Sequence, residues 1–155
     1  MTIIHIAAAL IEDASGRVLL VRKAGTRFFM QAGGKIEPGE DAATALCREL
    51  EEEIGLVVSP ADLRPLGHFD APAANEPDHR VDAHVFHLRT GHDPVPAAEI
   101  EEVIWVDPAA PIPLPVAPLT RDHILPCWRE MGTEPRSGRR SFRSVFPSPL
   151  ERGEG

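Results

Sequence analysis

Residues 34–56 read GKIEPGEDAATALCRELEEEIGL, and this stretch decides the fold. Apolar side chains recur in it at intervals of three and four residues, which is the period of an amphipathic helix. They are Ala43, Leu46, Cys47, Leu50 and Ile54. Asp41 precedes the run as an N-cap, and Gly55 follows it as a C-cap. The sequence therefore predicts a helix over residues 42–54.

Three glutamates lie together on the other side of this predicted helix: Glu49, Glu52 and Glu53. At 3.6 residues per turn they fall within an arc of roughly 100°. Carboxylates this close repel one another unless a cation compensates their charge. Because oxygen ligands suit hard cations, Mg²⁺ is the expected cofactor, with Mn²⁺ as the next choice.

The residues around these glutamates are of the kinds that support a metal site. Arg48 stands four residues before Glu52 and is expected to orient that carboxylate, while Glu40 is expected to hold the guanidinium through two hydrogen bonds. Gly33 and Gly34 are expected to form a loop in which a backbone carbonyl can bind the metal. A phosphate can also approach this loop closely, because it carries no side chains.

Outward from the helix, the chain alternates between apolar runs and turn residues. Residues 3–11 and 18–21 are separated by EDASG and predict a β-hairpin. Further strands are expected at residues 28–30, 63–71, 80–88 and 103–106. Thr120 is expected to cap a second helix that ends near Met131, with Pro126 kinking or delaying it. The predicted class is α+β or α/β, with a mixed sheet between helical layers.

Composition narrows the classes of partner. The net charge of −8 disfavours binding to nucleic-acid backbones or anionic membranes, which require a basic surface. Cys47 and Cys127 have no metal-type spacing and form no secretory framework, so a cytoplasmic location is expected. We expect one folded domain over residues 1–131 and a disordered tail over residues 132–155. The sequence leaves the oligomeric state open.

Residues 34–56 also fill every defined position of the Nudix hydrolase signature. That signature is glycine, five residues, glutamate, seven residues, then Arg-Glu-apolar-any-Glu-Glu-any-Gly-apolar. The chain therefore resembles the Nudix hydrolases, including their MutT-type members. The resemblance implies an α/β/α sandwich with a mixed sheet, and hydrolysis by water of a nucleoside diphosphate linked to another group.

The resemblance also implies roles for individual residues. Glu49, Glu52 and Glu53 would bind metal ions together with the carbonyl of Gly33, while Arg48 orients the carboxylates. The proton of the attacking water would pass to Glu49 or to a glutamate of a later loop. Three glutamates precede the strand at residues 103–106, namely Glu99, Glu101 and Glu102, and Glu99 is favoured.

The phosphates of the substrate are expected beside Gly34 in the glycine loop and near Lys23, at the end of the second predicted strand. Lys23, with Arg22 beside it, is a candidate phosphate ligand, although both can equally be a solvated strand end. Phe28 and Phe29 can pack in the core or stack on a base.

The leading hypothesis for the substrate is a nucleoside triphosphate, cleaved to a monophosphate and pyrophosphate. ADP-ribose or a nucleotide sugar is the alternative, because Pro72 stands where ADP-ribose-cleaving relatives tend to carry a proline. The absence of tyrosine counts against dinucleoside polyphosphates. A third hypothesis is a nucleotide sensor that binds without cleaving.

Overall fold

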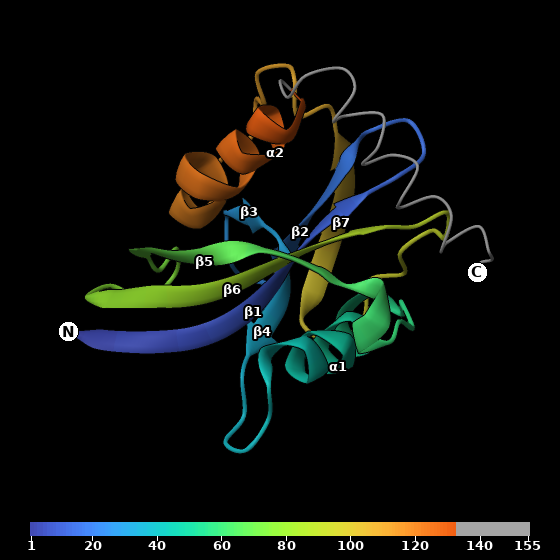
Figure 1. Ribbon diagram of the computed structural model, residues 1–155. Helices are drawn as coiled ribbons and strands as arrows, with labels where there is room; N and C mark the ends of the chain where they lie inside the picture. Colours follow the sequence, from blue (N-terminus) through green and yellow to red (C-terminus); the bar gives the residue numbers. More distant parts are fainter. Residues whose placement is uncertain (133–155) are drawn as a thin grey trace.

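A computed structural model describes residues 1–132 of the chain (Figure 1). The strands are β1 (Thr2–Glu12), β2 (Val18–Lys23), β3 (Phe29–Met30), β4 (Ala32–Lys35), β5 (Arg64–Pro72), β6 (His79–Arg89) and β7 (Ile100–Val106). The helices are α1 (Ala42–Ile54), a 3-10 turn over Pro60–Asp62, and α2 (Leu125–Gly132), which a wider π-helical turn over Thr120–Ile124 precedes. The tail predicted over residues 132–155 lies outside the described residues, except for Gly132.

The sheet is mixed, as predicted. Its main strand order is β3-β2-β1-β6-β5, while β4 pairs with β1 and β7 pairs with β2. β1 runs parallel to β6 along its whole length, from Thr2 opposite His79 to Glu12 opposite Arg89. Parallel neighbours need a long connection, and here it includes α1 and β5.

The predicted β1–β2 hairpin is only partly correct. The strands are antiparallel, but the register joins them at one pair, Glu12 and Val18. The turn between them is closed by Asp13, whose Oδ1 accepts hydrogen bonds from the backbone of Ser15 and Arg17. β2 then diverges from β1 and pairs along its length with β7, so the turn was predicted but the partner was not.

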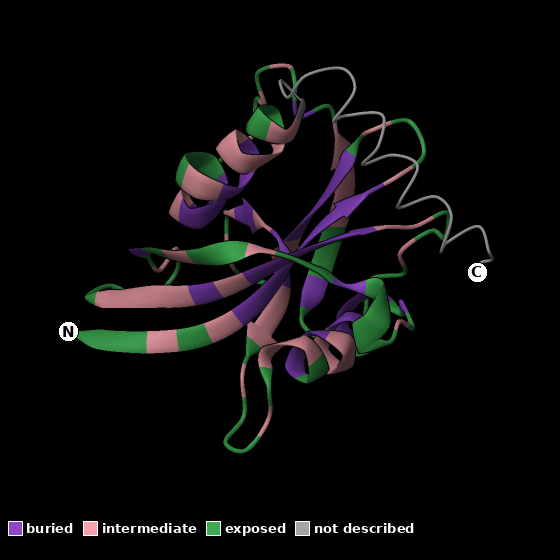
Figure 2. Ribbon diagram, viewed as in Figure 1, coloured by how far each residue is buried: buried purple, intermediate pink, exposed green. Residues whose placement is uncertain are grey.

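The two helices lie on opposite faces of the sheet, as Figure 1 shows. The buried residues form two clusters accordingly, one under α1 and the other under α2 (Figure 2). β1 supplies both, because alternate side chains of a strand point to opposite faces. Its Ala7, Ala9 and Ile11 pack with Leu46 and Leu50 of α1. The layered architecture predicted from the sequence is therefore confirmed.

The start of the second helix differs from the prediction. Leu119, not Thr120, stands at the N-cap position, and no side chain caps the turn. Thr120 is buried, and its hydroxyl donates a hydrogen bond to Gln31. The N–H of Leu125 reaches back to the carbonyl of Thr120, five residues earlier. This wide turn directly precedes Pro126, whose ring would collide with the carbonyl four residues before it in a regular α-helix.

No helix within residues 1–132 combines the length and the apolar character that crossing a membrane requires.

Candidate active site

Helix α1 presents three of its glutamates to a cavity. It begins at the predicted N-cap, where Asp41 accepts a hydrogen bond of 2.8 Å from the backbone of Thr44. It ends at Gly55, whose φ of 68° is the left-handed conformation that favours glycine. Leu46, Leu50 and Ile54 are buried against the sheet. The adjoining side of the helix carries Glu49, Glu52 and Glu53, which line the cavity.

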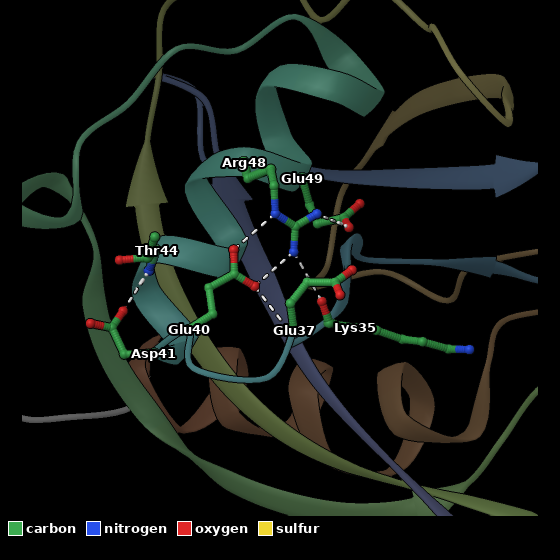
Figure 3. A network of polar contacts seen from close by, with 7 residues as sticks. All are labelled: Lys35, Glu37, Glu40, Asp41, Thr44, Arg48 and Glu49. Carbon is green, nitrogen blue, oxygen red and sulfur yellow. Dashed lines mark hydrogen bonds and ion pairs between the residues drawn. The ribbon is translucent and has the colours of Figure 1, made fainter.

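Arg48 lies at the centre of a polar network beside this cavity (Figure 3). Its Nε and Nη2 donate to the two carboxylate oxygens of Glu40, each at 2.9 Å, which is the expected bidentate pair. Its Nη1 donates to Glu49 at 2.8 Å. The prediction that Arg48 orients Glu52 is therefore wrong. Arg48 lowers the pKa of Glu40 to about 2, and in return the pKa of Arg48 is raised. Glu49 is thus held by a cation that Glu40 itself fixes.

Gly33 and Gly34 lie in strand β4 and not in a loop, which corrects the prediction. They pair with Ala8 and Ala7 of β1 in antiparallel register. A Cβ on Gly33 would lie 2.1 Å from the Ala7 carbonyl oxygen, and one on Gly34 would lie 2.5 Å from Cδ of Glu49. Only glycine allows the strand to pass this close to both β1 and the Glu49 carboxylate.

Glu53 is the most deeply buried acid of the cavity wall, with 6% of its surface exposed. Its Oε1 accepts a hydrogen bond of 3.2 Å from the backbone N–H of Gly33. Burial raises the pKa of Glu53 to about 7, and the charges of Glu49 and Glu99 act in the same direction. The Gly33 N–H and the charge of Lys23 lower this pKa but do not offset the burial. The site therefore has an excess of negative charge.

Glu99 lines the same cavity, close enough to Glu53 for its charge to raise the pKa of that group. Its backbone is fixed from two directions: the N–H of Ala97 donates to the carbonyl of Glu53, and the N–H of Ala24 donates to that of Glu99. Ala98 between them has a φ of 53°, which is unusual for a residue other than glycine. The chain thus turns tightly as it presents Glu99.

The other glutamates considered for this position lie elsewhere. Glu101 and Glu102 form ion pairs of 3.1 and 3.0 Å with Arg22. Arg22 is therefore occupied and does not line the cavity, whereas Lys23 does. Of the two basic residues predicted near the phosphates, only Lys23 lines the cavity with the glutamates of α1. Of the three glutamates predicted before the last strand, only Glu99 does.

The side chains fit a hard cation by chemistry and charge, although they are not arranged as a finished metal centre. Within residues 1–132, no three His, Cys, Asp or Glu side chains are positioned to hold an ion together. Glu49 is turned to Arg48 and Glu53 to Gly33, while Glu52 is exposed. A divalent cation among these carboxylates would offset the repulsion that raises the pKa of Glu53.

The cavity has a volume of about 680 Å³, which is within the range of small-molecule sites. One end is acidic and carries Glu49, Glu52, Glu53 and Glu99, with Lys23 among them. The other end lies on the α2 side of the sheet, where Ile6, Val81 and Leu119 of the apolar cluster under α2 line it. An anionic group and an apolar ring can therefore be bound together.

Two polar residues of the apolar end, Gln31 and Thr120, were not predicted as site residues. They are separated by 89 positions in the sequence, and no local motif connects them. Neither Phe28 nor Phe29 lines the cavity: Phe29 is buried, and Phe28 lies under the guanidinium of Arg27. Pro72, which is exposed, lines the cavity together with residues 73–76.

The chain is similar in sequence to proteins of a known family. A family profile described as NUDIX domain matches residues 3–126. The chain is 33% identical over 125 residues to a CTP pyrophosphohydrolase of Escherichia coli, covering 76% of this chain and 86% of that protein. It is 39% identical over 74 residues to an 8-oxo-dGTP diphosphatase of Haemophilus influenzae, covering 45% of this chain and 54% of that protein.

Solved structures show the same fold at lower sequence identity. A MutT protein from Methanosarcina mazei superposes with a TM-score of 0.71 at 21% identity, covering 86% of this chain and 97% of that chain. The solution structure of the ORF135 protein of E. coli has a TM-score of 0.60 at 24% identity, with 96% of both chains covered. The sandwich seen here is therefore shared with these proteins.

Proposed function

The chain belongs to the Nudix hydrolase family and is one of its pyrophosphohydrolases, and on that premise we propose that it cleaves nucleoside triphosphates to a monophosphate and pyrophosphate. The observation that carries this proposal is the two-part cavity, acidic at one end and apolar at the other. The first end suits a metal-bound polyphosphate, and the second suits a base. Two nucleoside triphosphates, CTP and 8-oxo-dGTP, also appear in the names of the relatives.

Mg²⁺ is the proposed cofactor, and Mn²⁺ is the second choice. Glu49, Glu52 and Glu53 would hold it through carboxylate oxygens, with the carbonyl of Gly33 as a further ligand. When bound, such an ion neutralises phosphate charge and lowers the pKa of a coordinated water.

The remaining steps fall to the chain's own side chains. We assign the removal of the water's proton to Glu99, because Glu49 already accepts a charged hydrogen bond from Arg48. The tight backbone at Ala98 fixes where the Glu99 carboxylate can reach. Lys23 supplies positive charge at the acidic end and would contact a phosphate beside Gly34. Arg48 keeps Glu49 in one orientation throughout, since Glu40 holds its guanidinium.

An ADP-ribose or nucleotide-sugar substrate is the second candidate. It is favoured by Pro72 and the segment that follows, because these residues line the cavity and could contact a second sugar. The free thiols of Cys47 and Cys127 fit a reducing compartment, so we place the enzyme in the cytoplasm, which fractionation of the source cells would test.

The test is a panel of nucleoside triphosphates, ADP-ribose and nucleotide sugars, incubated with Mg²⁺ or with a chelator. We expect pyrophosphate and a monophosphate from at least one triphosphate, and only in the presence of metal. Preferred cleavage of ADP-ribose would replace the substrate assignment with the second candidate. Tight binding of nucleotides without any turnover would instead identify a sensor.

A matched pair of variants tests the metal ligands in the same assay. Glu53→Gln removes a charged oxygen from the buried site and is expected to lower kcat about a hundredfold or more, as is typical of lost electrostatic stabilisation. Glu51→Gln lies in the same helix, is exposed and does not line the cavity, so it is expected to retain wild-type turnover. Near-normal activity of Glu53→Gln would remove Glu53 from the metal site.

A further inference from the structure

Gln31 places a buried side-chain amide at the apolar end of the cavity. Only 6% of its surface is exposed. Its Oε1 accepts a hydrogen bond of 2.7 Å from the hydroxyl of Thr120, which is itself 1% exposed. Its Nε2 has no hydrogen-bond partner among residues 1–132. One half of the amide is thus satisfied while the other is not.

An unpaired amide donor is unfavourable in a protein interior, because burial removes its hydrogen bonds to water and no protein group replaces them. The usual penalty is about 1–3 kcal/mol, and most buried polar side chains avoid it by finding a partner. An apolar residue such as leucine would fill this position without that penalty. The amide is therefore more readily explained by a ligand than by the stability of the fold.

The surroundings of Gln31 indicate which part of a ligand it meets. Gln31 is bonded to Thr120, which follows Leu119, and Leu119 packs with Ile6 and Val81 in the cluster under α2. Glu49, Glu53, Glu99 and Lys23 instead interact with one another at the other end. A phosphate would be paired with charge, and charge is concentrated at the acidic end. A single neutral N–H donor among apolar walls suits a carbonyl oxygen or a ring nitrogen of a flat heterocycle.

We propose that the amide NH2 of Gln31 donates a hydrogen bond to an acceptor atom on the base of the nucleotide, which makes Gln31 a specificity-determining residue. Thr120 is the positioning residue: its hydroxyl donates to Oε1, so the oxygen faces Thr120 and the nitrogen is directed away from it. Because Nε2 is buried, the base must pack closely against Gln31 and exclude water to receive the bond. This inference rests on the proposed function and specifies how its substrate is read.

The inference is tested by removing one acceptor at a time from the best substrate. In one set of base analogues a ring nitrogen is replaced by carbon, as in 7-deazapurine or 3-deazapyrimidine nucleotides. In a second set a carbonyl oxygen is removed or replaced by sulfur, as in 2-aminopurine or 2-thiopyrimidine nucleotides. Each analogue is compared with the natural nucleotide by kcat/KM. The proteins are the wild type, Gln31→Leu and Gln31→Glu. Gln31→Leu loses the donors, and Gln31→Glu keeps the size and the acceptor for Thr120 while also losing the donors.

We expect one analogue to be about tenfold poorer than the natural nucleotide for the wild type. Gln31→Leu and Gln31→Glu should be at least tenfold poorer on the natural nucleotide, and should no longer distinguish it from that analogue. The loss should appear mainly in KM, because the base lies away from the reacting phosphate. Equal discrimination by the wild type and both variants, or no discrimination by any of them, would overturn the assignment of Gln31.

Two further measurements keep the outcomes separate. The double variant Gln31→Leu/Thr120→Val removes both partners of the internal bond and should unfold at the wild-type denaturant midpoint or above, so that lost discrimination is not lost folding. The affinity of the corresponding monophosphates and their deaza analogues, measured by calorimetry, does not depend on turnover. Coupling in binding without hydrolysis would overturn the proposed function alone, while hydrolysis without coupling would overturn the role of Gln31 alone.

Discussion

Without a bound cation, the buried position of Glu53 conflicts with the negative charge of its carboxylate. Glu53 must be buried to lie next to Gly33, yet burial raises its pKa to about 7. A carboxyl whose pKa is higher in the folded chain than in the unfolded chain stabilises the fold at low pH. Its contribution is complete below about pH 4.5 and is lost as the pH rises through about 7.

Glu53→Gln should therefore stabilise the metal-free protein at high pH. The shift from 4.5 to about 7 corresponds to roughly 3 kcal/mol, as an order of magnitude. In the presence of a chelator, we expect the variant to exceed the wild type in unfolding free energy by up to that amount at pH 8, and by little at pH 5. Urea unfolding across this range measures the difference. The exposed Glu51→Gln serves as the control, and a pH-independent difference would contradict the burial of a titrating Glu53.

Replacing either Gly33 or Gly34 with alanine is expected to be harmful, but for different reasons at the two positions. In Gly33→Ala the new Cβ meets the backbone oxygen of Ala7 at 2.1 Å, and the φ of 150° disfavours a side chain. In Gly34→Ala it meets the end of the flexible Glu49 side chain at 2.5 Å. The first clash involves the sheet, and the second involves the site.

We expect Gly33→Ala to lose about 3 kcal/mol of unfolding free energy. Gly34→Ala should lose much less stability, while its kcat falls about a hundredfold, because a carboxylate displaced by about 1 Å is enough for such a loss. Denaturant unfolding and steady-state kinetics on the two variants separate these effects. Wild-type kcat in a folded Gly34→Ala would mean that the position of Glu49 is not critical.

Elements with a strong local pattern were predicted well, and those fixed by distant partners were not. Helix α1 was predicted from Ala42 to Ile54 with both caps, because its periodicity and its capping residues are all local. Strand β4 was predicted as a loop, because Gly33 and Gly34 have low strand propensity and only the contact with β1 makes them a strand. Thr120 was predicted to be a cap because its buried partner, Gln31, is 89 residues away.

Helix α2 is attached to the sheet by a buried carboxylate. Glu12 at the end of β1 accepts hydrogen bonds from Nε1 of Trp128 at 2.8 Å and pairs with Nε2 of His87 at 2.7 Å. Burial opposes ionisation of Glu12, yet these two hydrogen bonds outweigh it and leave its pKa below the usual value. Burial also lowers the pKa of His87.

Trp128→Phe keeps the aromatic packing of α2 but removes the donor to Glu12. We expect a loss of about 2 kcal/mol in unfolding free energy, which is typical of a hydrogen bond to a buried charged group. A double-mutant cycle with Glu12→Leu, which removes the acceptor, measures the interaction between the two side chains. The same loss from Trp128→Phe in both backgrounds would show that packing, and not this bond, attaches the helix.

At the scale of the whole molecule, the cavity touches every layer. Its wall includes side chains of α1, of β1 and β6, and of the segment that leads into α2. A ligand that fills it would bind the folded chain and not the unfolded one. Linkage then requires the fold to become more stable in its presence.

We therefore expect the monophosphate product to raise the unfolding free energy by about 2.7 kcal/mol at a concentration one hundred times its Kd. Denaturant unfolding with each of the common nucleoside monophosphates measures this effect. The change should be smaller for Gln31→Leu at the same ligand concentration. No stabilisation by any monophosphate up to millimolar concentration would argue against a base in the apolar end.

The pairing of β1 with β6 determines when the sheet can form during synthesis. β1 leaves the ribosome before β6 and finds this full-length neighbour only after Arg89 has emerged, because their register runs from Thr2 opposite His79 to Glu12 opposite Arg89. Contacts between segments this far apart close late and slow the folding of small domains. Until then the side of β1 that faces α2 lacks the later segments that cover it, and apolar surface exposed in this way favours aggregation of a folding chain.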